Sequence, residues 1–372
     1  MEVATLAKRA GIAAILVVVW LAYVEAACFA KLSVASADAD IIPRSRLLAV
    51  YGNAPWVNTF SDEWKPSNVL GYEAYVGWER KPFQGKTINI DASGVRRSVP
   101  SYCEDNKAYT IWMFGGSTVW GTGAPDWLTI PSLLAKKFEE SGRRVCIRNF
   151  GEKAWVSTQE MLKLILELKA SERKPDLVIF YDGPADVYES YQSGQPGLHQ
   201  NFDDTKQLLE GRASHSGGFR YLRETNIAKV LLRHKILGGR GKRSSAADIL
   251  SLARATVRCY LDNVKMVQAL GHEYRFEPVF FWEPTLSTGN KRLTADEEEA
   301  RDAAQKRSPG LQEVNQVAYA VLKAQAHSPV FPIADALDSS TETVFFDEAH
   351  VSAEGNRLVA DRMYATLEAE MH

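Results

Sequence analysis

The sequence predicts an α/β protein built around a parallel sheet. From about residue 105 onward, apolar runs rich in Ile, Val, Phe and Trp alternate with runs in which apolar residues recur every three or four positions. Strands and helices that alternate at this spacing form βαβ units, which give parallel strands. The chain has 372 residues, of which 45% are hydrophobic, so it can bury a large core around such a sheet.

The predicted elements follow one another in a regular order. The first long helix is expected to end at Gly142, and each strand is bounded by glycine, proline or charged residues. The predicted strands cover residues 108–116, 144–151, 175–183 and 273–284, and the predicted helices cover residues 130–142, 157–174, 254–271 and 353–371.

Two stretches depart from this alternation. Residues 31–104 are rich in aromatic residues, glycine and proline and have no continuous helical period, so we expect an extended or short β-rich lead-in. Residues 190–247 have little apolar periodicity and include the basic run "RHKILGGRGKR", which predicts an insertion. The chain therefore divides into a segment at 1–30, the lead-in, and an α/β domain at 105–372.

The first thirty residues have the pattern of an export signal. Lys8 and Arg9 precede an uncharged apolar run over residues 10–24. The run is shorter than the roughly 20 residues of an ideal membrane span, which favours a cleaved signal peptide. Trp20 and Tyr23 suit a membrane interface and favour a retained signal anchor. We expect an anchored protein whose main part lies outside the cytoplasm, periplasmic or extracellular, or else a secreted protein released by signal cleavage.

Charge and cysteine content limit the classes of function. A net charge of −2 provides no basic field that would favour nucleic acid. Four cysteines are too few for a disulfide framework; Cys103 and Cys146 could pair in an oxidising compartment, or both could be free and buried. The histidines share no metal-ligand spacing with one another or with cysteine, so no metal site is expected.

A serine follows the first predicted strand of the sheet. In "IWMFGGSTVWGTG" the strand ends at Gly-Gly-Ser, which places Ser117 at the carboxyl edge where open α/β sheets build their sites. The chain supplies a base far away, because "FFDEAHVSAEGN" places Asp347 three residues before His350 on a loop ahead of the last helix. Asp347 could orient one imidazole nitrogen while the other faces the serine hydroxyl. The same glycines could hold a dinucleotide phosphate, but a P-loop lysine and a clean G-x-G-x-x-G are missing.

Four motifs together resemble the SGNH, or GDSL-type, hydrolases, in particular the membrane-anchored kind associated with cell-surface polysaccharide. The motifs are "FGGSTVWG", "NFGEKAWVSTQE", "FYDGPADV" and "FFDEAHVSAEGN", and the stretch "YVGWERKPFQGKTINIDASGVRR" is similar to what precedes the nucleophile in such proteins. The similarity runs from roughly residue 70 to residue 370. It implies a three-layer α/β/α sandwich and hydrolysis or transfer of ester-linked acyl groups without a metal or an organic cofactor.

The resemblance assigns roles to individual residues. It makes Ser117 the nucleophile, His350 the general base and Asp347 its orienting partner. The oxyanion donors would be the amides of Ser117 and of either Ala154, at the usual glycine position, or Gly151. An alanine at position 154 can serve if its φ is negative.

A second departure from the family pattern concerns the third motif. The family's asparagine donor is replaced by Ala185, which has no side-chain donor. Tyr181, Asp182 and Glu283 follow or end strands and are expected to contact substrate.

These expectations define one leading function and two alternatives. The leading function is an exported esterase acting on O-acyl groups, such as acetyl groups, of a cell-envelope or secreted polysaccharide. The same residues could transfer the acyl group to a sugar. A protein of another class, a glycan-binding or assembly protein that has lost its oxyanion hole, would explain Ala185. The sequence does not determine the oligomeric state.

Overall fold

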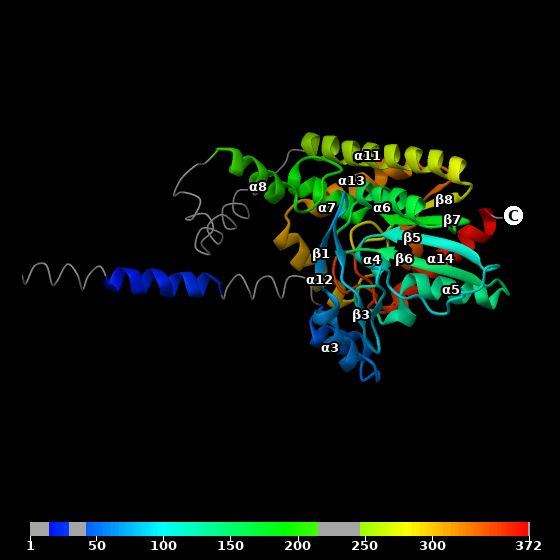
Figure 1. Cartoon of the computed structure of the whole chain (residues 1–372), viewed down its shortest axis with the longest axis horizontal. Coiled ribbons are helices and arrows are strands. Elements are labelled where there is room, and N and C mark those ends of the chain that lie inside the picture. The colour runs from blue at the N-terminus through cyan, green and yellow to red at the C-terminus, as the bar shows by residue number, and fades with distance from the viewer. Residues whose placement is uncertain (1–14, 30–41, 215–245, 371–372) are drawn as a thin grey trace, which may run out of the picture. The chain divides into compact units, whose positions relative to one another are not determined.

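The computed structural model describes residues 15–29, 42–214 and 246–370 (Figure 1). The chain forms two compact units by its internal contacts. One unit consists of Ile42–Phe202 and Arg243–His372 and holds the sheet, and the other consists of Met1–Ile41 and Asp203–Lys242. The predicted lead-in, from residue 42 onward, therefore belongs to the same unit as the α/β domain.

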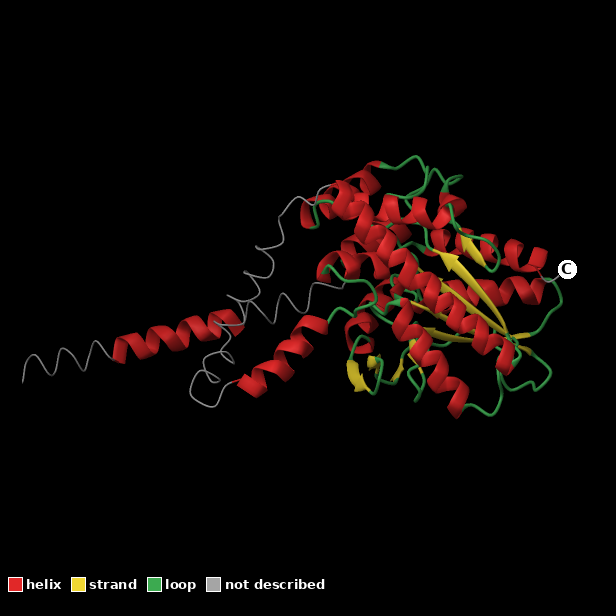
Figure 2. Cartoon of the chain, turned by 90° about the horizontal axis from the view of Figure 1, so that it is seen from above, coloured by secondary structure: helices red, strands yellow, loops and turns green. Residues whose placement is uncertain are grey.

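A five-stranded parallel sheet is the centre of the larger unit (Figure 2). Its strand order is β6-β5-β7-β8-β9, and the paired strands run parallel throughout. The chain passes from β5 to β6 on one side and returns to β7 on the other, so the order reverses between β5 and β7. The strands are β5 (Tyr109–Gly115), β6 (Val145–Gly151), β7 (Leu177–Asp182), β8 (Glu277–Trp282) and β9 (Val330–Pro332).

Helices cover both faces of this sheet, which confirms the three-layer arrangement. One apolar core lies between one face of the sheet, which includes Met113, and the helices α5 (Ile130–Glu140) and α14 (Ala353–Glu370). The other joins the opposite strand face to four helices. Those helices are α6 (Ser157–Ala170), α7 (Pro184–Ser193), α11 (Ala246–Tyr274) and α13 (Leu311–Lys323).

Aromatic side chains fix the second core across the strands. Phe150, Phe114, Phe180 and Phe280 come from β6, β5, β7 and β8, are register partners and stack in sequence, with ring centroids 4.8, 5.3 and 5.1 Å apart. Side chains alternate between the two faces of a sheet, so residues that are register partners place all four rings on the same face. Stacked aromatic pairs stabilise the fold beyond the burial of their surface. This row therefore holds the four strands in register.

The lead-in is more helical than its composition indicates. It contains α2 (Arg44–Tyr51) and α3 (Val57–Ser67), as well as the short antiparallel pairs β1 (Leu70–Glu73) with β2 (Gly77–Arg80) and β3 (Phe83–Gln84) with β4 (Asn89–Ile90). The expectation of an extended or β-rich segment is wrong for these helices. Their signal was the i, i+3, i+7 spacing of Val57, Phe60 and Trp64, which are all buried.

The other elements of the larger unit are α4 (Ser117–Trp120), η1 (Asp126–Leu128), α12 (Ala295–Arg307) and η2 (Ala334–Leu337). The helix α8 (Phe202–Ser214) belongs, from Asp203 onward, to the smaller unit. The predicted insertion at 190–247 falls largely on residues 215–245, outside the described residues. The predicted insertion starts within α7 and includes α8, and its end lies in α11, which starts earlier than the periodicity predicted.

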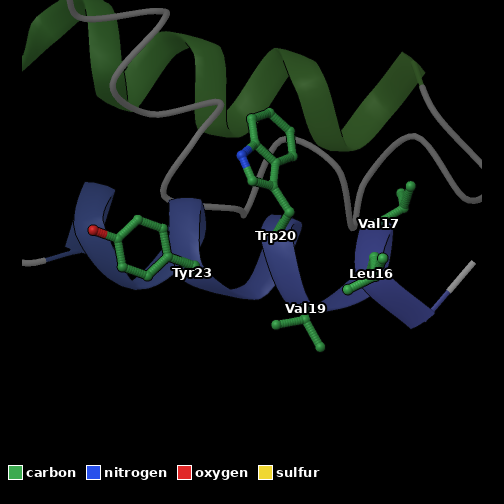
Figure 3. Close-up of a pocket in the computed structure, with 5 residues that line it drawn as sticks. All are labelled: Leu16, Val17, Val19, Trp20 and Tyr23. Atoms are coloured by element: carbon green, nitrogen blue, oxygen red, sulfur yellow. The ribbon is translucent and has the colours of Figure 1, made fainter. Parts of the chain in front are cut away.

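Residues 15–29 of the smaller unit form a helix with an exposed apolar surface. Figure 3 shows the side chains that line a pocket on it, namely Leu16, Val17, Val19, Trp20 and Tyr23. Within the described residues, no helix has both the length and the apolar character needed to span a bilayer. The predicted apolar run starts at residue 10, outside the described residues, and the signal segment stays a prediction.

A disulfide links two segments of the larger unit. Cys103 and Cys146 are bonded, with their Cα atoms 4.5 Å apart, and join the end of the lead-in to β6. Of the two arrangements left open by the sequence, the structure has the paired one. Cys28 and Cys259 are free.

Candidate active site

Ser117 lies directly beyond β5, at the carboxyl edge of the sheet and at the point where the strand order reverses. Open α/β sheets bind their ligands in the crevice at this point, where loops from neighbouring strands diverge. Gly116 caps the single helical turn α4, and Ser117 is its first residue (Figure 1). Its hydroxyl Oγ is 2.7 Å from Nε2 of His350, 233 residues further along the chain.

His350 is held by Asp347. The Nδ1 atom of His350 is 2.7 Å from Oδ2 of Asp347, and Oδ1 of the same carboxylate accepts the backbone N–H of His350 at 2.8 Å and of Ala349 at 3.0 Å. A carboxylate accepts hydrogen bonds, so it selects the tautomer with the proton on Nδ1. The unprotonated Nε2 then faces the serine hydroxyl, which is the arrangement that a general base requires.

Electrostatics keep Asp347 ionised. Burial acts to raise the pKa of its carboxyl, but the charge that His350 carries when it is protonated and the hydrogen bonds from His350 and Ala349 outweigh burial and lower the pKa to about 2. The side chains of His350 and Asp347 are 25% and 43% exposed, so the site is accessible to a substrate from solvent. The structure therefore brings together the three residues that the sequence proposed as a triad.

The turn that carries Ser117 is positioned by tertiary contacts, because one isolated helical turn is not stable in water. Nδ2 of Asn149, on β6, donates to the carbonyl of Val119 at 2.9 Å. Nη1 of Arg96, in the lead-in, donates to the carbonyls of Trp120 and Gly121 at 2.8 and 2.9 Å. These bonds satisfy the carbonyls at the end of α4 and fix the direction in which Ser117 points.

Two buried arginines of the lead-in also enclose the Trp120 ring. The guanidinium carbons of Arg80 and Arg96 lie 3.8 and 4.2 Å from the ring centroid. Arg80 forms a buried ion pair with Glu152, and Nε of Arg96 is 3.0 Å from Asp126. Desolvated cation–π contacts and paired charges favour a single geometry. This role could not be predicted for either arginine, because arginine is usually exposed.

Gly151 is required by close packing and is not an oxyanion donor. Its backbone N–H donates to Oδ1 of Asn149 at 2.9 Å, so it is not available to a ligand. A Cβ at position 151 would lie 2.2 Å from the backbone nitrogen of Trp120. The prediction that made Gly151 an alternative donor is therefore wrong. Glycine is needed at position 151 because β6 lies close to the backbone of the nucleophile turn.

Ala154 lies in a left-handed backbone conformation, with a φ of 53°. The condition of a negative φ is therefore not met, since the turn keeps the conformation that glycine normally provides, but the alanine still has a backbone N–H that can donate. The Ala154 N–H makes no hydrogen bond within the described residues, and neither does that of Ser117. A Cβ on Gly116, the residue before Ser117, would lie 3.9 Å from the carbonyl oxygen of Trp155, so the two turns are neighbours.

The three predicted substrate contacts are buried. Tyr181 is 1% exposed within the core that faces α5 and α14, and burial raises its pKa well above the usual value. Asp182 and Glu283 are 3% and 4% exposed. The prediction of direct substrate contact is wrong for all three in this structure, because the strand ends are covered. Ala185 is half-buried in the first turn of α7.

The covered strand ends form a cluster of four buried carboxyls, which we call the acidic cluster: Glu160, Asp182, Asp186 and Glu283. Burial is the main cause that raises all four pKa values, with Asp182 at about 7 and Asp186 at about 6. Among the described residues, Glu160 is the group within hydrogen-bonding reach of the Asp182 carboxylate, and it can donate a hydrogen bond only when it is protonated. The cluster is therefore most stable when it retains protons.

The acidic cluster adjoins the nucleophile turn. The Thr118 hydroxyl donates to Oε1 of Glu283 at 2.6 Å, and the Ser157 hydroxyl donates to Asp186 at 2.7 Å. Sequence reasoning missed the cluster because carboxylates at strand ends are usually solvated. Across residues 15–29, 42–214 and 246–370, no group of three or more His, Cys, Asp or Glu side chains is arranged to hold a metal ion.

The Asp182→Asn variant is expected to be more stable than the wild type at pH 8. Folding raises the pKa of the Asp182 carboxyl to about 7, from a value near 4 in the unfolded chain. The protonated carboxyl therefore contributes to the free energy of unfolding in full below pH 4, and this contribution is lost as the pH rises to 7. An amide carries no charge at any of these pH values, so we expect a gain of up to about 4 kcal/mol at pH 8 and no gain at pH 4. Urea unfolding at both values measures this difference.

Glu277→Gln is the control for that substitution, because Glu277 is exposed at the opposite end of β8. We expect its unfolding free energy to stay within about 0.5 kcal/mol of the wild type at both pH values. Equal destabilisation of Asp182→Asn at pH 4 and pH 8 would mean that Asp182 is ionised and satisfied in the fold.

Comparisons with known proteins find similarity only among solved structures. No protein-family model matches the chain, and no curated protein matches it. A G-D-S-L family lipolytic protein from Veillonella parvula is 13% identical over 70% of this chain and 96% of its own, with a TM-score of 0.35. A lipase/acylhydrolase from Enterococcus faecalis is 12% identical over 70% and 96%, with a TM-score of 0.36. The acetyl xylan esterase AlAXEase is 10% identical over 69% and 99%, with a TM-score of 0.37.

Proposed function

We propose that the protein is a serine esterase of the SGNH type. The observation that carries this proposal is the chain of hydrogen-bonding contacts from Ser117 Oγ to His350 Nε2 at 2.7 Å and from His350 Nδ1 to Asp347 at 2.7 Å. A serine, a histidine and a carboxylate from distant parts of the chain meet at the edge of the sheet where ligands bind. The four sequence motifs that resemble this family support the same assignment.

The chemistry follows from the geometry. His350 accepts the hydroxyl proton as Ser117 Oγ attacks the ester carbonyl, and Asp347 stays ionised and stabilises the imidazolium. Collapse of the tetrahedral intermediate breaks the bond to the alcohol, which takes the proton from His350. Water then attacks the acyl-serine with the same base, which releases the carboxylic acid and restores Ser117.

The oxyanion would be stabilised by two backbone donors. The N–H groups of Ser117 and Ala154 make no other hydrogen bond among the described residues, and their turns are adjacent. The third donor of the family is missing at Ala185, and the loss of one such donor lowers kcat by roughly a hundredfold to a thousandfold. We therefore propose a slow esterase rather than an inactive one.

The substrate and location are part of the proposal. We propose O-acyl groups, such as acetyl, of a cell-envelope or secreted polysaccharide, on the strength of the motif resemblance. The Cys103–Cys146 disulfide supports a location outside the cytoplasm, because such bonds persist in oxidising compartments. The exposed apolar side chains of residues 15–29 support attachment to a membrane. Acyl transfer would use the same residues, and product analysis with and without a sugar acceptor distinguishes it from hydrolysis.

A non-catalytic glycan-binding protein is the alternative that Ala185 favours. Labelling by a fluorophosphonate separates the two functions, because the reagent reacts with an activated serine and not with an ordinary one. We expect time-dependent labelling of the wild type and none of Ser117→Ala. Ser287→Ala is the matched control, since the Ser287 hydroxyl donates to Glu348 and has no histidine partner among the described residues, and the variant should label like the wild type. An unlabelled wild-type protein that is folded would contradict the esterase.

A further inference from the structure

The Tyr51 hydroxyl connects the two segments that form the candidate active site, namely the segment that carries Ser117 and the segment that carries His350. Tyr51 is the last residue of α2 and lies far from both segments in sequence. Its hydroxyl donates to the carbonyl of Gly123 at 2.9 Å and accepts the backbone N–H of Ala353 at 2.9 Å. Gly123 belongs to the loop that follows Ser117, and Ala353 follows His350 by three residues.

The hydroxyl can make both bonds at once because it stays protonated. Burial raises the pKa of Tyr51 above its usual value, and the N–H of Ala353 opposes this effect only in part. The neutral group donates one proton and accepts another. Ala353 is the first residue of α14, and its N–H is one of the amides that a helix cannot satisfy internally. Tyr51 thus satisfies the start of α14 and the Ser117 loop together.

Ring contacts fix where that hydroxyl lies. The Tyr51 ring meets Trp56 edge to face with centroids 4.7 Å apart, and it meets Phe346 at 5.8 Å. Phe346 directly precedes Asp347 and also packs on Gly123, where a Cβ would lie 2.6 Å from the Phe346 ring. Gly123 has a φ of 85°, so both its conformation and its surroundings require glycine.

We propose that Tyr51 is a positioning residue that sets the separation between Ser117 Oγ and His350 Nε2. The inference rests on the proposed function for its consequence in rate. A second link lies further along both segments, where Nδ2 of Asn356 in α14 donates to the carbonyl of Leu128 in η1 at 2.8 Å. Tyr51 is the nearer link, because its two hydrogen bonds end on backbone atoms six residues after Ser117 and three residues after His350.

Tyr51→Phe tests this proposal, since it removes the hydroxyl and keeps the ring. A displacement of about 1 Å in a catalytic group can lower the rate about a hundredfold, so we expect kcat for an aryl acetate to fall by about 10-fold to 100-fold with KM nearly unchanged. Fluorophosphonate labelling should slow by a similar factor. A crystal structure of the variant should place Oγ and Nε2 beyond the hydrogen-bonding range of about 3.2 Å.

Tyr191→Phe is the matched control, because the Tyr191 hydroxyl also joins two segments by donating to the carbonyl of Pro309 at 2.9 Å. It should lose less thermal stability than Tyr51→Phe, because this hydrogen bond is exposed and water can replace it, and it should keep the wild-type kcat. Tyr51→Phe with the wild-type kcat, labelling rate and separation would overturn the proposal while the esterase stands. If the wild type neither hydrolyses nor labels, the esterase fails, and the crystallographic separation in Tyr51→Phe still decides whether Tyr51 positions the two loops.

Discussion

Replacing His350 with alanine is expected to lower kcat/KM for an aryl acetate by at least about 10⁴-fold, because the serine hydroxyl then has no base. Ser117 Oγ has one titratable partner at hydrogen-bonding distance among the described residues, the Nε2 atom of His350. A neutral hydroxyl is a weak nucleophile at pH 7, and within residues 15–29, 42–214 and 246–370 no other titratable group contacts the Ser117 hydroxyl to replace the imidazole.

The remaining machinery sets a floor for this loss. The amides of Ser117 and Ala154 would still bind the carbonyl oxygen, so a small rate above that of water should persist. His272 provides the control, since it is exposed near the end of α11, and His272→Ala should retain full activity. Steady-state kinetics on the purified variants gives the comparison. A His350→Ala protein within about tenfold of the wild type would exclude the general-base role.

Replacing Arg96 with methionine is expected to lower the free energy of unfolding by about 3 to 5 kcal/mol, because it strands a buried charge. Arg96 is 1% exposed and donates to Asp126, which is 2% exposed. Its Nη2 atom also donates to the carbonyl of Ala124 at 2.7 Å, in addition to the two carbonyls at the end of α4. Methionine fills a similar volume but removes the guanidinium donors, so Asp126 keeps only its hydrogen bonds from Asn89 and loses its paired charge.

Arg357 provides the contrast for that prediction. It pairs with Glu354 and Asp361 on the surface of α14, with 46% of its side chain exposed. Exposed pairs contribute about 0 to 1 kcal/mol, so Arg357→Met should change the unfolding free energy by no more than that. Urea titrations of both variants measure the difference. If Arg96→Met loses less than about 1 kcal/mol, the lead-in does not hold the nucleophile turn as described.

The order of strands and helices could be predicted because each element carries its own periodicity. The strand from Tyr109 to Gly115 is a continuous apolar run between two helix faces, as a parallel strand should be. Ser117, Asp347 and His350 could be proposed as partners because motif order and chain topology place a strand end and a late loop at the same edge.

Contacts between distant segments could not be predicted in the same way. Arg96, Tyr51 and Glu283 act on neighbours between 24 and 302 residues away, and none of them belongs to a local period. A buried arginine or glutamate looks like a surface residue until its partners are known. The φ of Ala154 is also set by packing around the turn rather than by residue type.

The most direct test of the central claim is a crystal structure of the protein after reaction with a fluorophosphonate. We expect phosphorus bonded to Ser117 Oγ, His350 within hydrogen-bonding distance, and one phosphonyl oxygen about 2.7 to 3.1 Å from the amide nitrogens of Ser117 and Ala154. An unmodified Ser117 separated from His350, or a phosphonyl oxygen that points away from both amides, would contradict the proposed esterase.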